Sequence, residues 1–338
     1  MADRNDGGMV IDIHAHVMTP EAEEIAAPLF TPDKDPFIDF SGPRSEAYNR
    51  QHFAEIIPNL TSPEQRLRDM DRMGVDVQAI SVVPPQYYYW APPEIGARLS
   101  AMVNDRLFEI VQDHPDRFVG LGTLPLQDID LALAELDRVV HDLRFGGLEI
   151  CTNVNGTDFD DPRFVPLFEE AVEHDLLLVV HPNGFVHGQR LADHYLINTL
   201  GMPMDSTVFI GRMIFGGVME RFPDLKVCVT HGGGYLPFYP ARFDHAYEAR
   251  EDCREHITRE PSSYLAQMYF DTMVFDPQMI RTLVQRWGAD HVLLGTDYPY
   301  DMGETDPLGL LAKVEDLGDR ERDLIAGGNA ARLLGLGT

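Results

Sequence analysis

Short apolar runs recur along the chain, and amphipathic helical patterns separate most of them. Such runs are typical of strands that are buried on both faces of a parallel sheet. We predict eight strands, at residues 9–16, 77–83, 118–124, 147–151, 176–181, 226–231, 268–272 and 291–297. Eight strands with helical crossovers predict an α/β fold, a (β/α)8 TIM barrel, that forms a single domain over residues 1–338. An open doubly wound sheet is the alternative, but no Gly-rich phosphate loop follows the first strand.

Helices are predicted between the strands, at residues 62–73, 93–114, 129–143, 164–174, 277–287 and 321–334, the last broken at Gly327-Gly328. Ser62 followed by Pro63 is a typical helix start. Two longer segments interrupt the alternation. Residues 18–61 are polar, contain Pro and Gly and show little periodicity, so we expect a lid insertion after the first strand. Residues 182–222 are expected to form a helical insertion.

Polar residues close several of the apolar strands. His14 and His16 lie two residues apart in the first strand, so their side chains should point to the same side. The fifth strand ends at His181, the sixth at His231 and the eighth at Asp297. The carboxyl ends of barrel strands meet at one face, where active sites are built, so these side chains should surround one volume. Imidazoles with one carboxylate suit Zn²⁺, and Mn²⁺, Fe²⁺ or Co²⁺ also fit the ligand types.

Three histidines and one aspartate leave a position open for water or substrate, and one of the four histidines need not be a ligand. His231 precedes Gly232-Gly233-Gly234, which leave room for a substrate, so this imidazole could act as general acid or base. The fourth strand contains no lysine that could bridge two metals as a carbamate, which favours one metal ion. Glu149 in that strand could bridge a second metal or support the ligands of the first, and the second interpretation is favoured.

An aromatic run, Tyr87-Tyr88-Tyr89-Trp90, follows the second strand. It could pack beneath the lid or form a pocket wall, and the two interpretations have equal weight. A pocket wall would favour a flat aromatic or conjugated substrate. On that interpretation Tyr88 and Trp90 are candidate substrate-binding residues.

The formal net charge of −28 over 338 residues narrows the choice of partners. An acidic surface repels phosphates and anionic lipid headgroups, so we expect no nucleic-acid partner and no membrane partner. It also repels an anionic substrate, so an acid-binding site needs local cations. The three cysteines lack paired spacing, and buried reduced thiols are expected for Cys151 and Cys228. Residues 1–8 are polar, and neither a signal peptide nor a long apolar span is present, so we expect a cytoplasmic protein.

Four motifs together resemble those of the amidohydrolase superfamily: I-D-I-H-A-H (11–16), V-V-H-P (179–182), T-H-G-G-G (230–234) and L-L-G-T-D-Y-P (293–299). More narrowly, the chain is similar to the branch of aminocarboxymuconate semialdehyde decarboxylase and the hydroxybenzoate decarboxylases. The resemblance covers nearly the whole chain, including Met70-Asp71, Gly74–Gln78, Pro125–Asp128 and Gly188-Gln189-Arg190.

This resemblance implies a single divalent metal, usually zinc, held by the residues at four positions: His14, His16, His181 and Asp297. It implies that His231 is the catalytic acid or base, acting beside Asp297. It further implies that Arg242 reaches a substrate carboxylate in a neighbouring subunit, and hence a homodimer or larger homo-oligomer.

Two positions depart from the family pattern. A substrate-binding arginine expected before Pro63 falls on Ala54, and Arg50 or Arg44 could take its place. A tryptophan expected after Gly188-Gln189-Arg190 falls on His194.

We therefore expect a metal-dependent, non-oxidative decarboxylase, a carboxy-lyase, acting on a small hydroxylated aromatic or muconate-like carboxylic acid. The same site would suit a hydrolase or hydratase of a lactone, amide or ring-cleavage product. A non-catalytic metal-binding barrel is a further alternative, which the open coordination position disfavours.

Overall fold

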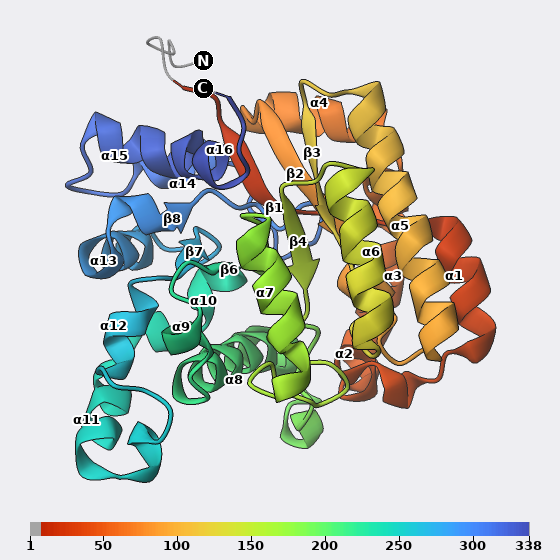
Figure 1. Cartoon of the computed structure of the whole chain (residues 1–338). Coiled ribbons are helices and arrows are strands. Elements are labelled where there is room, and N and C mark those ends of the chain that lie inside the picture. Colours follow the sequence, from red (N-terminus) through yellow and green to blue (C-terminus); the bar gives the residue numbers. More distant parts are fainter. Residues whose placement is uncertain (1–7, 338) are drawn as a thin grey trace.

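The computed structural model describes residues 8–337; residues 1–7 of the polar N-terminal segment and residue 338 lie outside the described part of the chain. Eight parallel strands form one sheet in the order β1 to β8, surrounded by helices (Figure 1). The strands are β1 (Ile11–Val17), β2 (Val77–Val82), β3 (Phe118–Gly122), β4 (Gly147–Ile150), β5 (Leu177–Val180), β6 (Lys226–Val229), β7 (Tyr269–Asp271) and β8 (Val292–Leu293). The predicted (β/α)8 barrel is confirmed.

Backbone hydrogen bonds nearly close the barrel between its first strand and the segment that follows its last. The Ile13 amide donates to the Leu294 carbonyl at 2.9 Å, and the His16 amide donates to the Tyr298 carbonyl at 2.9 Å. Asp297 donates its amide to the His14 carbonyl at 2.8 Å. The candidate residues of β1 are therefore tied directly to the segment that carries Asp297.

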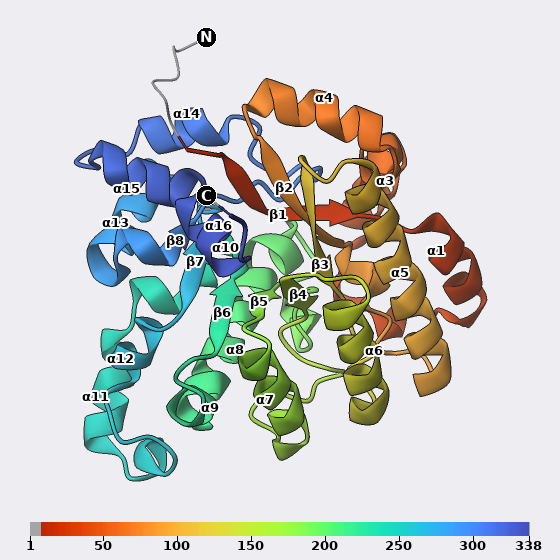
Figure 2. The ribbon, with the colours of Figure 1, turned by 45° about the horizontal axis from the view of Figure 1, so that its top comes forward.

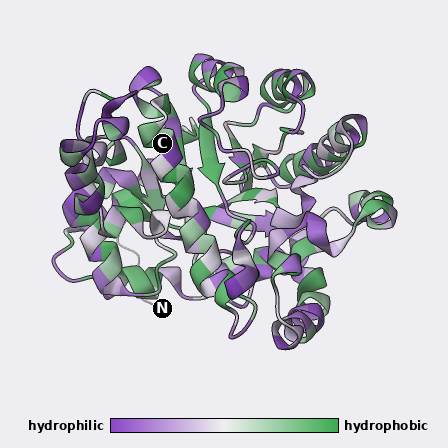
Figure 3. Cartoon of the chain, turned by 90° about the horizontal axis from the view of Figure 1, so that it is seen from below, coloured by the Kyte–Doolittle hydropathy of each residue, from purple (hydrophilic) through white to green (hydrophobic). Residues whose placement is uncertain are grey.

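Apolar side chains fill the space on both sides of the strands. Inside the barrel, Ile11, Ile13, Leu177 and Val179 pack in one cluster with residues of α16 (Asn329–Leu333). Figure 2 shows α16 lying across the end of the barrel. A larger cluster fills the layer between strands and outer helices, and the strands are mostly apolar while the helices carry polar residues outward (Figure 3). Cys151 and Cys228 are buried free thiols, as predicted.

The main crossover helices have nearly the predicted bounds: α4 (Pro63–Met73), α5 (Pro93–Asp113), α6 (Ile129–His141), α7 (Val165–Glu173) and α13 (Pro277–Trp287). The Ser62 hydroxyl accepts the Gln65 amide at the start of α4, which confirms the predicted cap. The predicted break in the last helix falls in a π-helical turn, Leu324–Gly328, between α15 (Asp319–Asp323) and α16. No helix within residues 8–337 has the length and apolar character that crossing a membrane requires.

The segment at residues 18–61 is mostly helical, although its sequence shows little periodicity. It contains α1 (Pro20–Ala26), α2 (Pro36–Asp39) and α3 (Pro43–Thr61), and each begins with a proline in its first turn. Only Ile56 and Leu60 of α3 are buried, so the helix presents too narrow an apolar stripe for its period to be recognised. Residues 182–222 hold the predicted helical insertion, with α8 (Met202–Phe215) and α9 (Val218–Arg221).

The remaining helices follow β6 and β8: α10 (Thr230–Gly233), α11 (Ala241–Ala249), α12 (Pro261–Leu265) and α14 (Pro307–Ala312). In Figures 1 and 2, α11 stands at the outer edge of the molecule, away from the strands.

Candidate metal centre and active site

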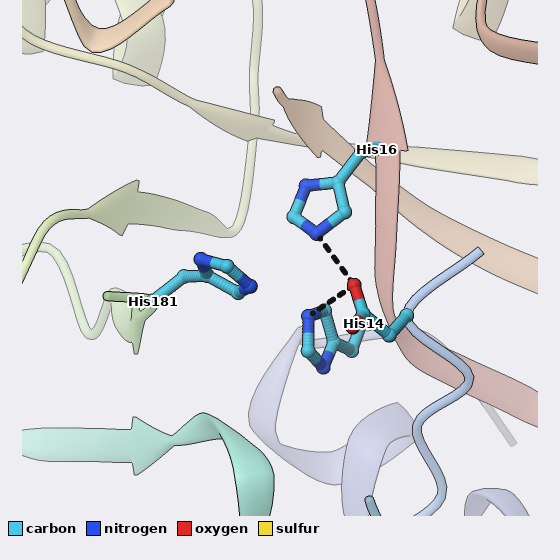
Figure 4. Close-up of side chains that lie close together, drawn as sticks. His14, His16 and His181 are labelled. Atoms are coloured by element: carbon cyan, nitrogen blue, oxygen red, sulfur yellow. Dashed lines mark ion pairs between the residues drawn. The ribbon is translucent and has the colours of Figure 1, made fainter. Parts of the chain in front are cut away.

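Four buried side chains converge at the carboxyl ends of the strands: His14, His16, His181 and Asp297. One nitrogen or oxygen from each lies within 4.8 Å of the corresponding atom of every other. The carboxylate oxygen Oδ1 of Asp297 lies 3.4 Å from Nε2 of His14 and 3.2 Å from Nε2 of His16. Figure 4 shows the three imidazoles facing a common point, with dashed lines for these two ion pairs.

The atoms that face this point lack hydrogen-bond partners. Nε2 of His14, Nε2 of His16, both ring nitrogens of His181 and Oδ1 of Asp297 are buried without one. A buried polar atom without a hydrogen bond lowers the free energy of unfolding. A bound cation that accepts the lone pairs of these atoms would explain why several of them surround one point. Three imidazole nitrogens and a carboxylate oxygen are a donor set for Zn²⁺ and similar divalent ions. The residues present therefore fit a divalent metal.

The opposite ring nitrogens of the β1 histidines are held by acceptors. Nδ1 of His14 lies 2.7 Å from Oδ2 of Asp271, and Nδ1 of His16 lies 2.9 Å from the Val82 carbonyl. A hydrogen on each Nδ1 leaves the lone pair on Nε2, which is the tautomer that a metal requires. Asp271 lies at the end of β7, as the candidate ligands lie at the ends of their strands. It was not among the predicted residues, although a search for polar residues at strand ends would have found it.

Charge and burial set the protonation of the group. Burial and the neighbouring imidazoles hold the pKa of His181 well below its ordinary value, so this ring is neutral. Burial opposes a charge on His14, but Asp297 and Asp271 raise its pKa well above the ordinary value. Burial likewise opposes ionisation of Asp297, yet the charge of His14 and the close approach of the other imidazoles hold its pKa well below the ordinary value. Metal binding would release the proton of His14, so affinity falls with falling pH.

His231 lies beside the cluster with a less buried side chain, which is 14% exposed. Its Nε2 is 3.6 Å from Oδ2 of Asp297, and its ring centroid is 4.9 Å from that of His181. The backbone at His231 is left-handed, with φ 55°, as it is at Gly232, with φ 61°. This turn directs the imidazole to the cluster, and a side chain at Gly232 would collide with Val274.

Glu149 is fully buried at the end of β4, but its oxygens are engaged by hydroxyl groups. Oε2 accepts from Ser81 at 2.6 Å, and Oε1 accepts from Tyr87 at 2.8 Å. Oε2 also lies 4.0 Å from Nδ1 of His16. Glu149 is not part of the four-residue group, and this geometry favours the supporting role over a bridge to a second metal.

A cavity of about 430 Å³ opens onto the group and is lined in part by His181 and Asp297. Its wall comes from the segment at residues 18–61, from the loops after β2 and β5, and from the loop after Asp297. Met18, Phe37 and Phe53 are among its apolar lining residues. The volume and the mixed wall suit a small organic substrate.

The two predicted arginines occupy different places. Arg50 lines the cavity, but its side chain is 74% exposed and pairs with Glu46 at 2.6 Å. Arg242 is exposed on α11 and is not among the residues that line this chain's cavity. The predicted contact of Arg242 with a neighbouring subunit's site stays a prediction.

Tyr88 and Trp90 are not among the residues that line the cavity, and the structure favours the other interpretation, packing beneath the segment at residues 18–61. The Tyr88 hydroxyl reaches a carboxylate oxygen of Glu23 at 3.3 Å, and its side chain is buried. Trp90 packs against Phe30 and Lys34. The left-handed backbone at Tyr88, with φ 53°, turns the run away from the cavity and beneath the segment at residues 18–61, a feature that the sequence does not indicate.

The fold and the four-residue group define a (β/α)8 barrel with a candidate metal centre at the carboxyl ends of its strands. The sequence profile of the amidohydrolase family matches residues 11–336, and the chain belongs to this family.

Three known proteins illustrate the likeness. A 2-amino-3-carboxymuconate-6-semialdehyde decarboxylase of Dictyostelium discoideum is 37% identical over 285 residues, which cover 84% of this chain and 79% of that protein. A 5-carboxyvanillate decarboxylase of Sphingomonas paucimobilis is 27% identical, with a TM-score of 0.86 over 97% of this chain and 99% of that one. A dihydroxybenzoic acid decarboxylase from Polaromonas, solved with bound manganese, has a TM-score of 0.82 over 97% of each chain; at 24% identity it supports the fold alone.

Proposed function

We propose that this protein is a metal-dependent, non-oxidative decarboxylase of a small hydroxylated aromatic or muconate-like carboxylic acid. The observation that carries the proposal is the set of unpartnered, buried ligand atoms at the floor of the cavity. The Dictyostelium and Sphingomonas proteins are decarboxylases, which supports the reaction class.

The proposed ligands of one divalent ion are His14, His16, His181 and Asp297. Zinc is our first choice because three imidazoles and a carboxylate are typical of its sites, with manganese, iron and cobalt as alternatives. Once bound there, the ion would act as a Lewis acid toward the substrate's oxygens.

The proposed role of His231 is proton transfer at the substrate carbon. In decarboxylation the bond between that carbon and the carboxyl carbon breaks, CO₂ departs, and the electron pair left on the carbon takes up a proton. His231 lies beside the cluster, and Nε2 is its ring nitrogen nearer to Asp297, so this atom can deliver the proton. Asp297 would act both as ligand and as the anion that orients His231.

Substrate recognition is assigned to Arg242 of a neighbouring subunit and to Arg50 of the same chain. Each guanidinium could bind a carboxylate through charge-assisted hydrogen bonds. We therefore propose a homodimer or larger homo-oligomer, located in the cytoplasm. We also propose that residues 18–61, which supply much of the cavity wall, act as a lid over a single catalytic domain.

A screen for CO₂ release tests this function. Purified protein loaded with Zn²⁺ or Mn²⁺ is incubated with hydroxybenzoates, carboxyvanillates and muconate semialdehyde acids. Release of CO₂ with formation of the decarboxylated product is expected for at least one class. Turnover of lactones, amides or ring-cleavage products without CO₂ would instead indicate the hydrolase or hydratase alternative.

Replacing Arg242 with alanine is expected to raise KM for the carboxylate substrate about 10- to 100-fold, because a hydrogen bond to a charged group contributes about 1.5–3 kcal/mol. Arg50→Ala should have a smaller effect, since this exposed side chain already pairs with Glu46. Steady-state kinetics measure both. Arg250→Ala, at the end of the same helix and paired with Asp252, is the control. An unchanged KM in Arg242→Ala would remove this arginine from the site.

A further inference from the structure

A buried polar network lies beside the candidate metal centre and involves none of its proposed ligand atoms. Asp12, two residues before His14, is fully buried, as is Gln78 in β2, and Arg66 of α4 is 2% exposed. Arg66 donates through Nη1 to Oε1 of Gln78 at 2.7 Å, and Gln78 donates through Nε2 to Oδ2 of Asp12 at 2.7 Å. A chain of hydrogen bonds between two charged groups thus runs from a helix to the first strand.

Asp12 faces this network because β1 is irregular. The pairing of β1 with β2 shifts by one residue between Asp12 and Ala15, which marks a β-bulge. Bulges redirect side chains and are common beside active sites. Strict alternation would place Asp12 on the side of His14 and His16, whereas its side chain binds Gln78, outside the four-residue group.

The carboxylate of Asp12 joins the two segments that carry three of the four candidate ligands. Its Oδ1 accepts the His14 amide at 3.0 Å and the Thr296 amide at 3.0 Å, and Thr296 immediately precedes Asp297. Its Oδ2 accepts the Thr296 hydroxyl at 2.5 Å. Arg66 in turn donates through Nη2 to the carbonyl of His16. Each of these backbone groups lies at or next to a candidate ligand.

The hydrogen bonds determine which group of each side chain donates and which accepts. Arg66 can only donate, so Gln78 must present its oxygen to Arg66 and its NH₂ to Asp12. Asp12 receives four donors, which is the full capacity of an ionised carboxylate. A fully satisfied buried network is rigid, whereas one reversed bond leaves two donors facing each other.

We propose that Asp12, Gln78 and Arg66 form a positioning network that holds the bulge of β1 against the Thr296-Asp297 segment and so sets the spacing of the metal ligands. The inference rests on the metal site of the proposed function. None of its members belongs to the four-residue group or lines the cavity. Their effect is on metal affinity, because ligands held at the correct separation lose little entropy on binding.

Exchanging the acid and the amide tests this network. In Asp12→Asn, the new NH₂ group faces the NH₂ of Gln78, and turning Gln78 would present that NH₂ to Arg66. In Gln78→Glu, two carboxylates face each other. The double variant Asp12→Asn/Gln78→Glu again pairs a donor with an acceptor at every bond, because the carboxylate introduced in β2 accepts from Arg66 and from the amide introduced in β1; the bond between the two strands then runs in the opposite direction to that of the parent.

The remaining hydrogen bonds are also kept in the double variant. The side-chain oxygen introduced in β1 still accepts the amides of His14 and Thr296, and the Thr296 hydroxyl can accept from the new NH₂ group instead of donating. The net charge equals that of the parent chain. The double variant therefore moves the carboxylate from β1 to β2 and reverses two hydrogen bonds, those of residue 12 with residue 78 and with the Thr296 hydroxyl, while every group keeps a partner.

The measurement is the Kd for Zn²⁺ by competition with a chromophoric chelator, with the thermal unfolding of the metal-free proteins recorded alongside. Each single variant is expected to bind about 10- to 100-fold more weakly, the usual effect of losing a partner of a metal ligand. The double variant should return to an affinity close to that of the parent. Glu135→Gln, which alters a buried carboxylate of α6 bonded to Asn104 and Arg138, should lower the unfolding temperature without changing Kd.

Parent-like affinity in Asp12→Asn would overturn the network, as would a double variant that binds no better than the single ones. If a single variant fails to fold, the double variant decides: native Kd supports the network, and weak binding or misfolding contradicts it. A parent protein that binds no Zn²⁺ would refute the proposed metal site and this inference together, whereas tight parental binding with unchanged variants refutes the inference alone.

Discussion

Asp297→Ala is expected to lose bound metal and catalytic activity together. The substitution removes the only carboxylate of the four-residue group and leaves three imidazoles as the remaining candidate ligands. Oδ1 of Asp297 lies close to Nε2 of both β1 histidines. Within residues 8–337, no other carboxylate can take this place without a rearrangement. Losing a residue that hydrogen-bonds to a metal ligand weakens metal binding about 10- to 100-fold. Losing a ligand itself should weaken metal binding further.

Metal content after gel filtration and the rate with added metal measure this effect. Asp301→Ala is the matched control, because Asp301 lines the same cavity four residues later but lies outside the four-residue group. That variant should keep its metal. Full metal retention in Asp297→Ala would contradict the ligand assignment.

His231→Asn is expected to have the opposite pattern, with metal retained and turnover lost. A positioned general acid or base contributes about 10²- to 10⁴-fold to a rate, so kcat should fall by that factor. Asparagine retains a polar group of similar size but cannot transfer the proton at neutral pH. Metal content should equal that of the parent, because the four proposed ligands are unchanged.

His52→Asn is the matched control for this histidine. His52 also lines the cavity, with Nε2 3.9 Å from a carboxylate oxygen of Asp301. Its replacement should change kcat far less than that of His231. Loss of metal in His231→Asn would make His231 a ligand and refute its assignment as the proton-transfer group.

The barrel and its polar strand ends could be predicted from the sequence because both depend on local patterns. Strands buried on both faces must be apolar throughout, and a polar residue at the end of such a run is conspicuous. This rule brings together His14, His16, His181 and Asp297, which the structure places in one group. The rule applies equally to Asp271, at the end of β7. The hydrogen bond of Asp271 with His14 becomes evident only in the three-dimensional structure, in which β7 lies between β6 and β8 in the sheet.

Features that depend on local backbone irregularities could not be predicted in the same way. The bulge that turns Asp12 away from the cluster and the left-handed turn at Tyr88 leave no recognisable mark in the apolar pattern. Nor does the pattern pair Arg66 with Gln78, because contacts between a helix and a distant strand follow from packing. The helices of residues 18–61 are similarly hidden, since few of their side chains are buried.

The dependence of CO₂ release on metal loading tests the central claim most directly. Metal is removed from the protein with a chelator and restored in known amounts, and CO₂ release from the best substrate of the screen is measured at each step. We expect no release without metal, a linear rise with added metal and saturation at about one ion per chain. Release that persists in the metal-free protein, or that saturates only at two ions per chain, would contradict a single-metal decarboxylase.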